Sequence, residues 1–277
     1  MPKEEMRASG VCHQDIICVL GMHRSGTSVL MRVLNLLGVE LGANEFLTTE
    51  PVAFNPKGYW EHCDITAIND AILRRHGGSW DEPPLLPPDW ETSPAIDDLR
   101  QRARQLIREH FTEVRRWGWK DPRSCLTLPF WQQLFPDMRY VICLRNPIEV
   151  AHSLEHRDGL SAKQSSDLWF TYVSSALNHS EGKQRLVIFY EDLMEDCLRE
   201  MQRLADFLGE PGRARQVDVQ GAVRQFVEKG LQHHHASVMQ AAASPVIDPR
   251  ARALYVAERI SVTLGRKDID EQVLARR

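Results

Sequence analysis

The sequence predicts an α/β fold of three layers, in which helices flank a central, mostly parallel β-sheet of roughly four to five strands. Short apolar runs alternate along the chain with longer segments whose apolar residues recur at helical spacing. Residues 16–20, 138–144 and 185–190 are clear strands, and a weaker strand ends at Lys120. Strands that alternate with helices favour parallel pairing with right-handed crossovers. In such sheets, ligands bind at the carboxyl ends of the strands.

Helices are predicted in the intervals between these strands. Gly38 ends the first helix, and Ser93-Pro94 and Asn146-Pro147 begin two later ones, because serine and asparagine cap helices and proline suits the first turn. The segments 40–55 and 80–90 show no periodicity, and the second contains four prolines. The predicted helices cover residues 27–37, 64–76, 93–116, 127–134, 146–155, 161–180, 193–208 and 251–264.

The composition is that of an ordinary globular protein: of the 277 residues, 43% are hydrophobic and 26% charged. A net charge of −4 argues against a nucleic-acid partner, so any polyanion would need cations gathered locally. No apolar stretch approaches the ~18 residues that suggest a membrane span. The first ten residues lack an apolar signal core, and a cytoplasmic protein is predicted. The six cysteines form no C-x-x-C pair, which favours reduced thiols over disulfides or a zinc site.

The first strand leads through a tight loop, Gly21 to Gly26, into the first helix. A strand that turns through glycines into a helix offers N–H groups and the positive end of the helix dipole to an anion. The two glycines, followed by Thr27 and Ser28, nearly match the P-loop pattern G-x-x-x-x-G-K-[ST]. Thr27 replaces the lysine that reaches the β- and γ-phosphates, which disfavours a conventional ATP or GTP hydrolase. Within the loop, Arg24 supplies a cation instead.

The alternative to an anion site is an ordinary turn between strand and helix, in which Ser25 or Thr27 caps the helix. Cations at the other strand ends favour the anionic ligand over this alternative. If the sheet is parallel, all strand ends face one crevice. Any one of these cations alone is consistent with a surface salt bridge, but their joint placement favours a polyanion. The crevice is expected to contain Arg24, Lys120, Arg123 and Arg145.

Three separated motifs resemble those of the sulfotransferases that use 3′-phosphoadenosine 5′-phosphosulfate (PAPS). Residues 23–28 (HRSGTS) are similar to the family's P-K-S-G-T-T or P-R-S-G-T-T loop for the 5′-phosphosulfate. Residues 143–147 (CLRNP), followed by Ser153, resemble its 3′-phosphate motif, and residues 189–193 (FYEDL) resemble its Y-E-D-L run. Residues 119–123 (WKDPR) resemble the K-D-P turn of tyrosylprotein-type and many bacterial members. The resemblance is therefore to the bacterial-type or tyrosylprotein-sulfotransferase-like branch of the P-loop sulfotransferase fold.

The resemblance implies that PAPS is the donor and adenosine 3′,5′-bisphosphate (PAP) the product, and that no metal takes part. The loop N–H groups of Ser25 to Ser28 would hold the 5′ end of the donor. Arg145 would grip the 3′-phosphate bidentately, and the Ser153 hydroxyl would donate a further hydrogen bond. The implied donor-binding residues are Arg24, Ser25, Gly26, Thr27, Ser28, Arg145 and Ser153.

The contacts to the adenine are less clear. Many cytosolic members have a tryptophan after the loop to stack on the base, and this chain has Val29 there. The family's C-terminal glycine-lysine motif is not recognisable, although Arg224 or Lys229 could substitute for it.

The resemblance also suggests catalytic residues for an in-line displacement that depends on positioning and charge. Arg24 corresponds to the family's loop cation and would neutralise charge on the leaving phosphate oxygen, and Lys120 would lie near the sulfuryl group. The candidate general base is Glu61, in a run (NPKGYWEH, 55–62) that resembles bacterial members. A carboxylate that merely complements a helix dipole is an equal alternative for Glu61. Rival bases are Glu45 and Glu50, with His62 a weaker one.

We therefore predict a single sulfotransferase domain over residues 1–277, with a core at 14–210 that carries the donor motifs. Residues 40–115 would supply acceptor-side loops and helices, and residues 211–277 a C-terminal helical segment. His233-His234-His235 is expected to be an exposed turn rather than a metal site. The acceptor could be a small molecule, a carbohydrate, a lipid or a peptide, and a homodimer stays open. The alternatives are a P-loop nucleotide kinase or triphosphatase, and a non-catalytic nucleotide-binding protein of sulfotransferase-like fold.

Overall fold

The computed structural model describes residues 14–227 and 236–274, with side chains through residue 265. Its centre is a four-stranded sheet of β1 (Asp15–Leu20), β2 (Arg116–Lys120), β3 (Arg139–Leu144) and β4 (Arg185–Phe189). The strand order is β2-β1-β3-β4, and every pair is parallel. The predicted parallel sheet is confirmed, and all four strands end at one edge.

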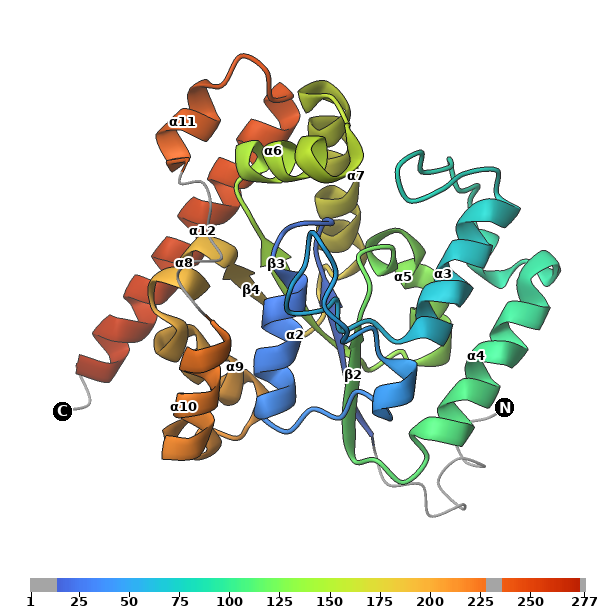
Figure 1. The fold of residues 1–277 in the computed structure, drawn as a ribbon, viewed down its shortest axis with the longest axis horizontal. Coiled ribbons are helices and arrows are strands. Elements are labelled where there is room, and N and C mark those ends of the chain that lie inside the picture. Colours follow the sequence, from blue (N-terminus) through green and yellow to red (C-terminus); the bar gives the residue numbers. More distant parts are fainter. Residues whose placement is uncertain (1–13, 228–235, 275–277) are drawn as a thin grey trace.

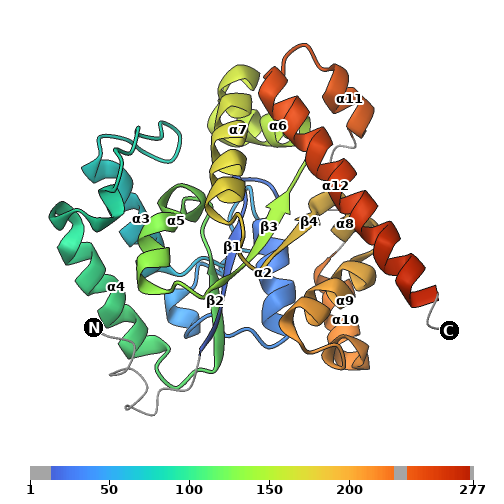
Figure 2. The same ribbon diagram turned by 180° about the vertical axis from the view of Figure 1, so that it is seen from behind.

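Helices cover both faces of this sheet (Figures 1 and 2). The alternation of side chains along β1 explains why both faces are apolar: Ile16, Cys18 and Leu20 join one hydrophobic cluster, and Ile17 and Val19 join the other. The first cluster includes side chains from helices within residues 63–179 and 241–255, and the second includes side chains from helices within residues 27–36 and 190–226. The three-layer architecture predicted from the sequence is therefore confirmed.

The helix bounds agree with the predicted pattern in most places. The helices before β3 are α2 (Thr27–Leu36), α3 (Cys63–Arg75), α4 (Asp97–His110) and α5 (Ser124–Leu134). Those that follow are α6 (Pro147–Asp158), α7 (Ala162–His179), α8 (Tyr190–Glu195), α9 (Cys197–Leu208), α10 (Val217–Phe226), α11 (Val238–Ala243) and α12 (Pro249–Leu274). Among the described residues, none of the helices is long and apolar enough to cross a membrane.

Several predicted helices differ from those observed. The helix predicted over 93–116 ends at His110, because Arg116 already belongs to β2. The helix predicted over 193–208 is two helices, since Asp196 leaves the helical conformation and its side chain caps α9 by accepting the Arg199 N–H. Helix α12 continues to Leu274, beyond the predicted end at residue 264, and α10 and α11 were not predicted.

Candidate active site

A cleft of about 900 Å³ opens where the four strands end. Its walls come from the segments that follow β1, β2, β3 and β4, and also from residues 53–61 and Trp80. The sequence-predicted residues that line it are Arg24, Gly26, Thr27, Ser28, Glu61, Lys120, Arg123, Arg145 and Ser153. Ser25 does not line it. The expectation that parallel strand ends would bring these side chains to one crevice agrees with this arrangement.

The glycine loop packs tightly against its neighbours. Gly26 has φ +87°, and a Cβ there would lie 2.1 Å from Cδ2 of Tyr190. Gly26 is also the N-cap of α2, and no side chain caps this helix. The alternative of a helix capped by Ser25 or Thr27 is therefore wrong. The first N–H groups of α2 have no intrahelical partner, which leaves them available to an anion in the cleft.

Ser25 is oriented differently from the sequence expectation. Its N–H donates to the carbonyl of Met22 at 3.1 Å, so it is not available to a ligand in this conformation. Its hydroxyl is fully buried and has no hydrogen-bond partner among the described residues. The N–H groups that remain for an anion belong to Gly26, Thr27 and Ser28.

Arg24 lies beside the β3–α6 motif. Its Nε donates to Oγ of Ser153 at 2.8 Å, and its Nη2 donates to the carbonyl of Phe54 at 2.8 Å. Burial lowers the pKa of Arg24, and the nearby charges of Arg157 and Arg145 lower it further. Within the described part of the chain, no carboxylate lies within ion-pair distance of Arg24. The guanidinium therefore has no ion-pair partner among the described residues, although the Asp158 carboxylate, which also lines the cleft, raises its pKa in part. A cation without a direct ion pair suits an anion-binding site.

Arg145 contacts the backbone of the loop. Its Nη1 donates to the carbonyl of Arg24 at 2.9 Å, and its Nη2 lies 3.4 Å from Oε2 of Glu149. Its guanidinium stacks over the Tyr190 ring, with Cζ 4.6 Å from the centroid. The sequence expectation paired Ser153 with Arg145 on one phosphate; in the structure, the Ser153 hydroxyl is bonded to Arg24.

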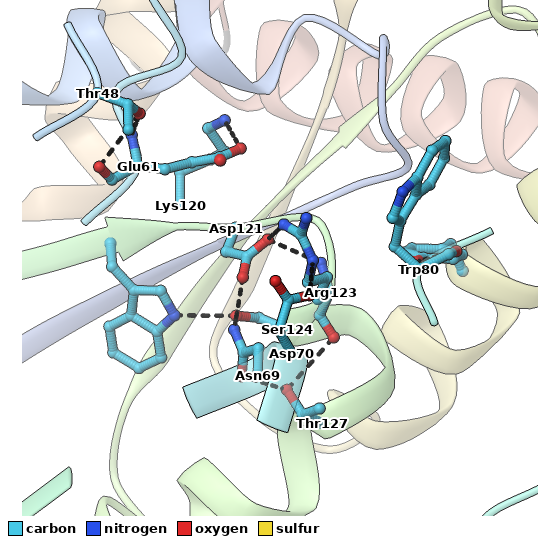
Figure 3. Close-up of polar contacts among 12 residues, drawn as sticks. Thr48, Glu61, Asn69, Asp70, Trp80, Lys120, Asp121, Arg123, Ser124 and Thr127 are labelled. Carbon is cyan, nitrogen blue, oxygen red and sulfur yellow. Dashed lines mark hydrogen bonds and ion pairs between the residues drawn. The ribbon is translucent and has the colours of Figure 1, made fainter. Parts of the chain in front are cut away.

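Glu61 and Lys120 form a buried ion pair, 2.6 Å between Oε1 and Nζ (Figure 3). The Lys120 side chain is 1% exposed and that of Glu61 14%. Burial raises the pKa of Glu61 above its ordinary value, although the Lys120 charge lowers it in part. Trp60, immediately before Glu61, has φ +59°, and Thr48 Oγ1 accepts the Glu61 N–H at 3.1 Å. These contacts hold the Glu61 carboxylate in the cleft.

The rival bases lie elsewhere. Glu45 and Glu50 are exposed and do not line the cleft. His62 is buried against Phe46 and Phe111, also outside the cleft, and its burial lowers its pKa to about 4. Of the four candidates, only Glu61 reaches the cleft.

Arg123 lines the cleft, but its charge is compensated. Its Nε lies 2.6 Å from Oδ1 of Asp70, and its Nη1 lies 2.9 Å from Oδ1 of Asp121 (Figure 3). Burial alone would lower the pKa of Arg123, but these carboxylates, with that of Glu61, raise it. Asp121 is fully buried and also accepts from Nδ2 of Asn69 at 2.7 Å. Arg123 therefore lies in the crevice as expected, but its charge is already paired with Asp70 and Asp121.

Other lining residues were not assigned a role from the sequence. Residues 40–115 were expected to supply acceptor-side loops, and of the irregular segments 40–55 and 80–90 within them, Ala53, Phe54, Asn55 and Trp80 line the cleft. Val29 lines it together with Lys57 and Phe226, whose position on α10 no sequence pattern indicated. Arg224 is exposed and away from the cleft. Lys229 and residues 233–235 lie outside the described residues.

A possible set of metal ligands lies away from the cleft. One atom from each of His62, Cys63 and Asp64 lies within 4.8 Å of the others. Asp64 is already paired with Nη2 of Arg102 at 3.1 Å. The Arg102 charge opposes a cation at this position.

The fold and the cleft together define a class: an α/β protein in which a glycine loop, a helix N-terminus and an arginine with no ion-pair partner among the described residues face one cleft at the strand ends. Such a site suits a phosphate- or sulfate-bearing ligand. A sequence model described as "Sulfotransferase family" matches residues 16–214. The chain belongs to the sulfotransferase family, and the family predicted from the motifs is confirmed. Membership supports sulfuryl transfer in general.

Sequence identity between this chain and individual relatives is low. A putative protein-tyrosine sulfotransferase of Caenorhabditis briggsae is 28% identical over 136 residues, which cover 43% of this chain and 48% of that protein. The match thus spans about half the length of this curated relative. A sulfotransferase of Mycobacterium tuberculosis aligns with a TM-score of 0.48 and 18% identity, over 83% of this chain and 77% of that one. A mouse sulfotransferase solved in complex with PAP aligns with a TM-score of 0.42 and 18% identity, over 85% and 73% of the two chains.

Proposed function

We propose that this chain transfers the sulfuryl group of PAPS to an acceptor hydroxyl or amine and releases PAP. The observation that carries the proposal is the meeting, in one cleft, of Arg24, which has no ion-pair partner among the described residues, with the buried Glu61–Lys120 pair. The first suits an anionic donor, and the second suits removal of a proton beside a developing negative charge. Family membership supports the same reaction class.

In this proposal, the donor lies along the loop. The N–H groups of Gly26, Thr27 and Ser28 would hold its 5′-phosphosulfate at the start of α2. Arg145 would bind the 3′-phosphate, and Ser153 would join it once the donor replaces its contact with Arg24. The adenine would lie toward the wall that contains Val29, Lys57 and Phe226. No lysine reaches toward a γ-phosphate from the position of Thr27, which is consistent with a donor that has none.

The transfer would proceed by in-line displacement. The acceptor oxygen or nitrogen attacks sulfur, the bond from sulfur to the 5′-phosphate oxygen breaks, and its electron pair leaves with PAP. Arg24 would stabilise that oxygen, and Lys120 would stabilise the charge on the sulfuryl oxygens. Glu61 would take the acceptor proton, and its raised pKa brings it closer to the pKa of an effective base at neutral pH.

A radiolabel assay tests the proposal. Purified protein is incubated with ³⁵S-PAPS and a panel that contains a tyrosine peptide, a phenol, a saccharide, an amine and a hydroxylated lipid. We expect label transfer to at least one of them, with loss of transfer in Glu61→Gln. Binding of PAP without transfer to any acceptor in the panel would instead support the non-catalytic alternative. The acceptor class, the domain division, a homodimer and the cytoplasmic location stay predictions.

A further inference from the structure

Two carbonyl groups of the glycine loop accept hydrogen bonds from residues at the end of β3. The Arg145 Nη1 donates to the carbonyl of Arg24 at 2.9 Å. The thiol of Cys143 donates to the carbonyl of Ser25, with Sγ and O 3.1 Å apart. Two consecutive loop carbonyls are therefore bonded to one strand end.

The start of the loop is fixed by a second buried thiol. The Gly21 N–H donates to Sγ of Cys125, on α5, at 3.1 Å. On the β3 side there is no spare room, because a Cβ at Gly21 would lie 2.5 Å from the carbonyl oxygen of Cys143. The loop thus sits between α5 and β3, and a side chain at Gly21 would collide with β3.

Because a peptide unit is planar, the hydrogen bond to the Ser25 carbonyl also fixes the direction of the N–H group that follows it. The C=O of Ser25 and the N–H of Gly26 belong to the same peptide unit, and in a trans peptide they point in opposite directions. When the Ser25 carbonyl points at the Cys143 thiol, the Gly26 N–H must point away from β3. Gly26 itself lines the cleft. The thiol contact therefore sets the direction of one N–H group of the proposed anion site.

We infer that Cys143 is a positioning residue, whose thiol keeps the Gly26 N–H directed at the 5′-phosphosulfate of the donor. The inference rests on the proposed function for the identity of the ligand, but the orientation of the loop does not depend on it. Cys143 lies behind the loop, on the side opposite the ligand, and does not line the cleft. It would act on the ligand only through the loop.

The protonation state of the thiols fits this role. Cys143 and Cys125 are both fully buried. Burial raises the pKa of Cys143, and burial raises the pKa of Cys125 to about 12. Cys143 therefore keeps its S–H proton at neutral pH and can donate it to the Ser25 carbonyl, despite being a weak donor.

The test compares Cys143→Ala, which removes the donor, with Cys143→Ser, which keeps one. The matched control is Cys18→Ala, because Cys18 is also fully buried, lies on the neighbouring β1, and has no hydrogen bond to the loop among the described contacts. Two quantities are measured: PAP affinity by isothermal titration calorimetry, and amide hydrogen exchange of the loop peptide in the ligand-free protein. Both are recorded well below each variant's melting temperature.

We expect Cys143→Ala to bind PAP about 3- to 10-fold more weakly, the range of one net hydrogen bond, and its loop amides to exchange faster. Cys143→Ser should restore both, and Cys18→Ala should lower the melting temperature without affecting either. Two results would overturn the inference and show that Cys143 only packs against the loop. One is unchanged PAP affinity and loop exchange in Cys143→Ala, and the other is an equal loss of affinity and protection in Cys18→Ala. If the wild type fails to bind PAP, the proposed function fails, and the exchange experiment alone still decides whether the thiol orients the loop.

Discussion

Replacing Lys120 with methionine tests the role of the buried ion pair. The Lys120 ammonium lies 2.6 Å from Glu61 and its side chain is 1% exposed, so little solvent reaches it. Removing one partner of a buried pair costs about 3–5 kcal/mol when the other stays charged. Loss of a positioned cation that stabilises the transition state lowers kcat by roughly 10²–10³-fold. We therefore expect a large loss of turnover and a much smaller loss of PAP affinity.

The pH dependence gives this variant a second, independent signature. Burial raises the pKa of Glu61 and Lys120 lowers it, so in Lys120→Met the pKa rises further. A base works only when deprotonated, so the acid limb of the kcat profile should move to higher pH.

The same carboxyl makes the stability of the wild-type protein depend on pH. Between the ordinary Glu pKa of 4.5 and the raised pKa of Glu61 in the folded protein, the folded state holds a proton that the unfolded state has lost. The free energy of unfolding should therefore fall as pH rises through this window.

The assay is ³⁵S transfer to the best acceptor of the panel, from pH 5 to 9, with PAP affinity measured in parallel. Lys163→Met is the matched control, since Lys163 forms an exposed ion pair with Asp167 on α7. The control should leave turnover and the acid limb unchanged. An acid limb that stays in place in Lys120→Met, or a loss of PAP affinity larger than the loss of turnover, would refute the reasoning and make Lys120 a donor-binding residue.

Three further substitutions test separate parts of the cleft. Arg145→Ala should weaken PAP binding by about 2–5 kcal/mol, measured by calorimetry, because it removes a largely desolvated partner of the phosphate; unchanged affinity would remove Arg145 from the donor site. Glu61→Gln should keep PAP affinity and lower kcat by roughly 10²–10⁴-fold, and full activity would show that Glu61 is not the base. Gly26→Ala should lower the melting temperature and abolish measurable PAP binding, because a Cβ at φ +87° would lie 2.1 Å from the Tyr190 ring; wild-type affinity would show that the loop can move without loss of the site.

Much of the fold could be predicted because its signals are local. Each strand is a short buried run between turn formers, and parallel pairing follows from the alternation of strands with helices. The same rule brings Arg24, Lys120 and Arg145 to one edge, since each follows a different strand of the sheet. The helix break at Asp196 was missed because apolar spacing continues through it, although aspartate is a common N-cap residue and its side chain caps α9 here.

The parts of the site that could not be predicted depend on contacts between distant segments. The charge of Arg123 is compensated by Asp70 on α3, a pairing that exists only once α3 packs beside the turn after β2. The Ser25 N–H bonds to Met22 because of the local turn of the loop, which the motif alone does not specify. Phe226 reaches the cleft from α10, a helix with no recognisable motif.

The central claim is that the cleft binds a donor with a 3′-phosphate and no γ-phosphate, and calorimetric titration tests it most directly. PAP, and separately ATP with Mg²⁺, are titrated into the wild-type protein under the same conditions. We predict that PAP binds with the higher affinity and that its binding is strongly weakened in Arg145→Ala. Tighter binding of ATP with Mg²⁺ would contradict the account and favour a nucleotide kinase or triphosphatase.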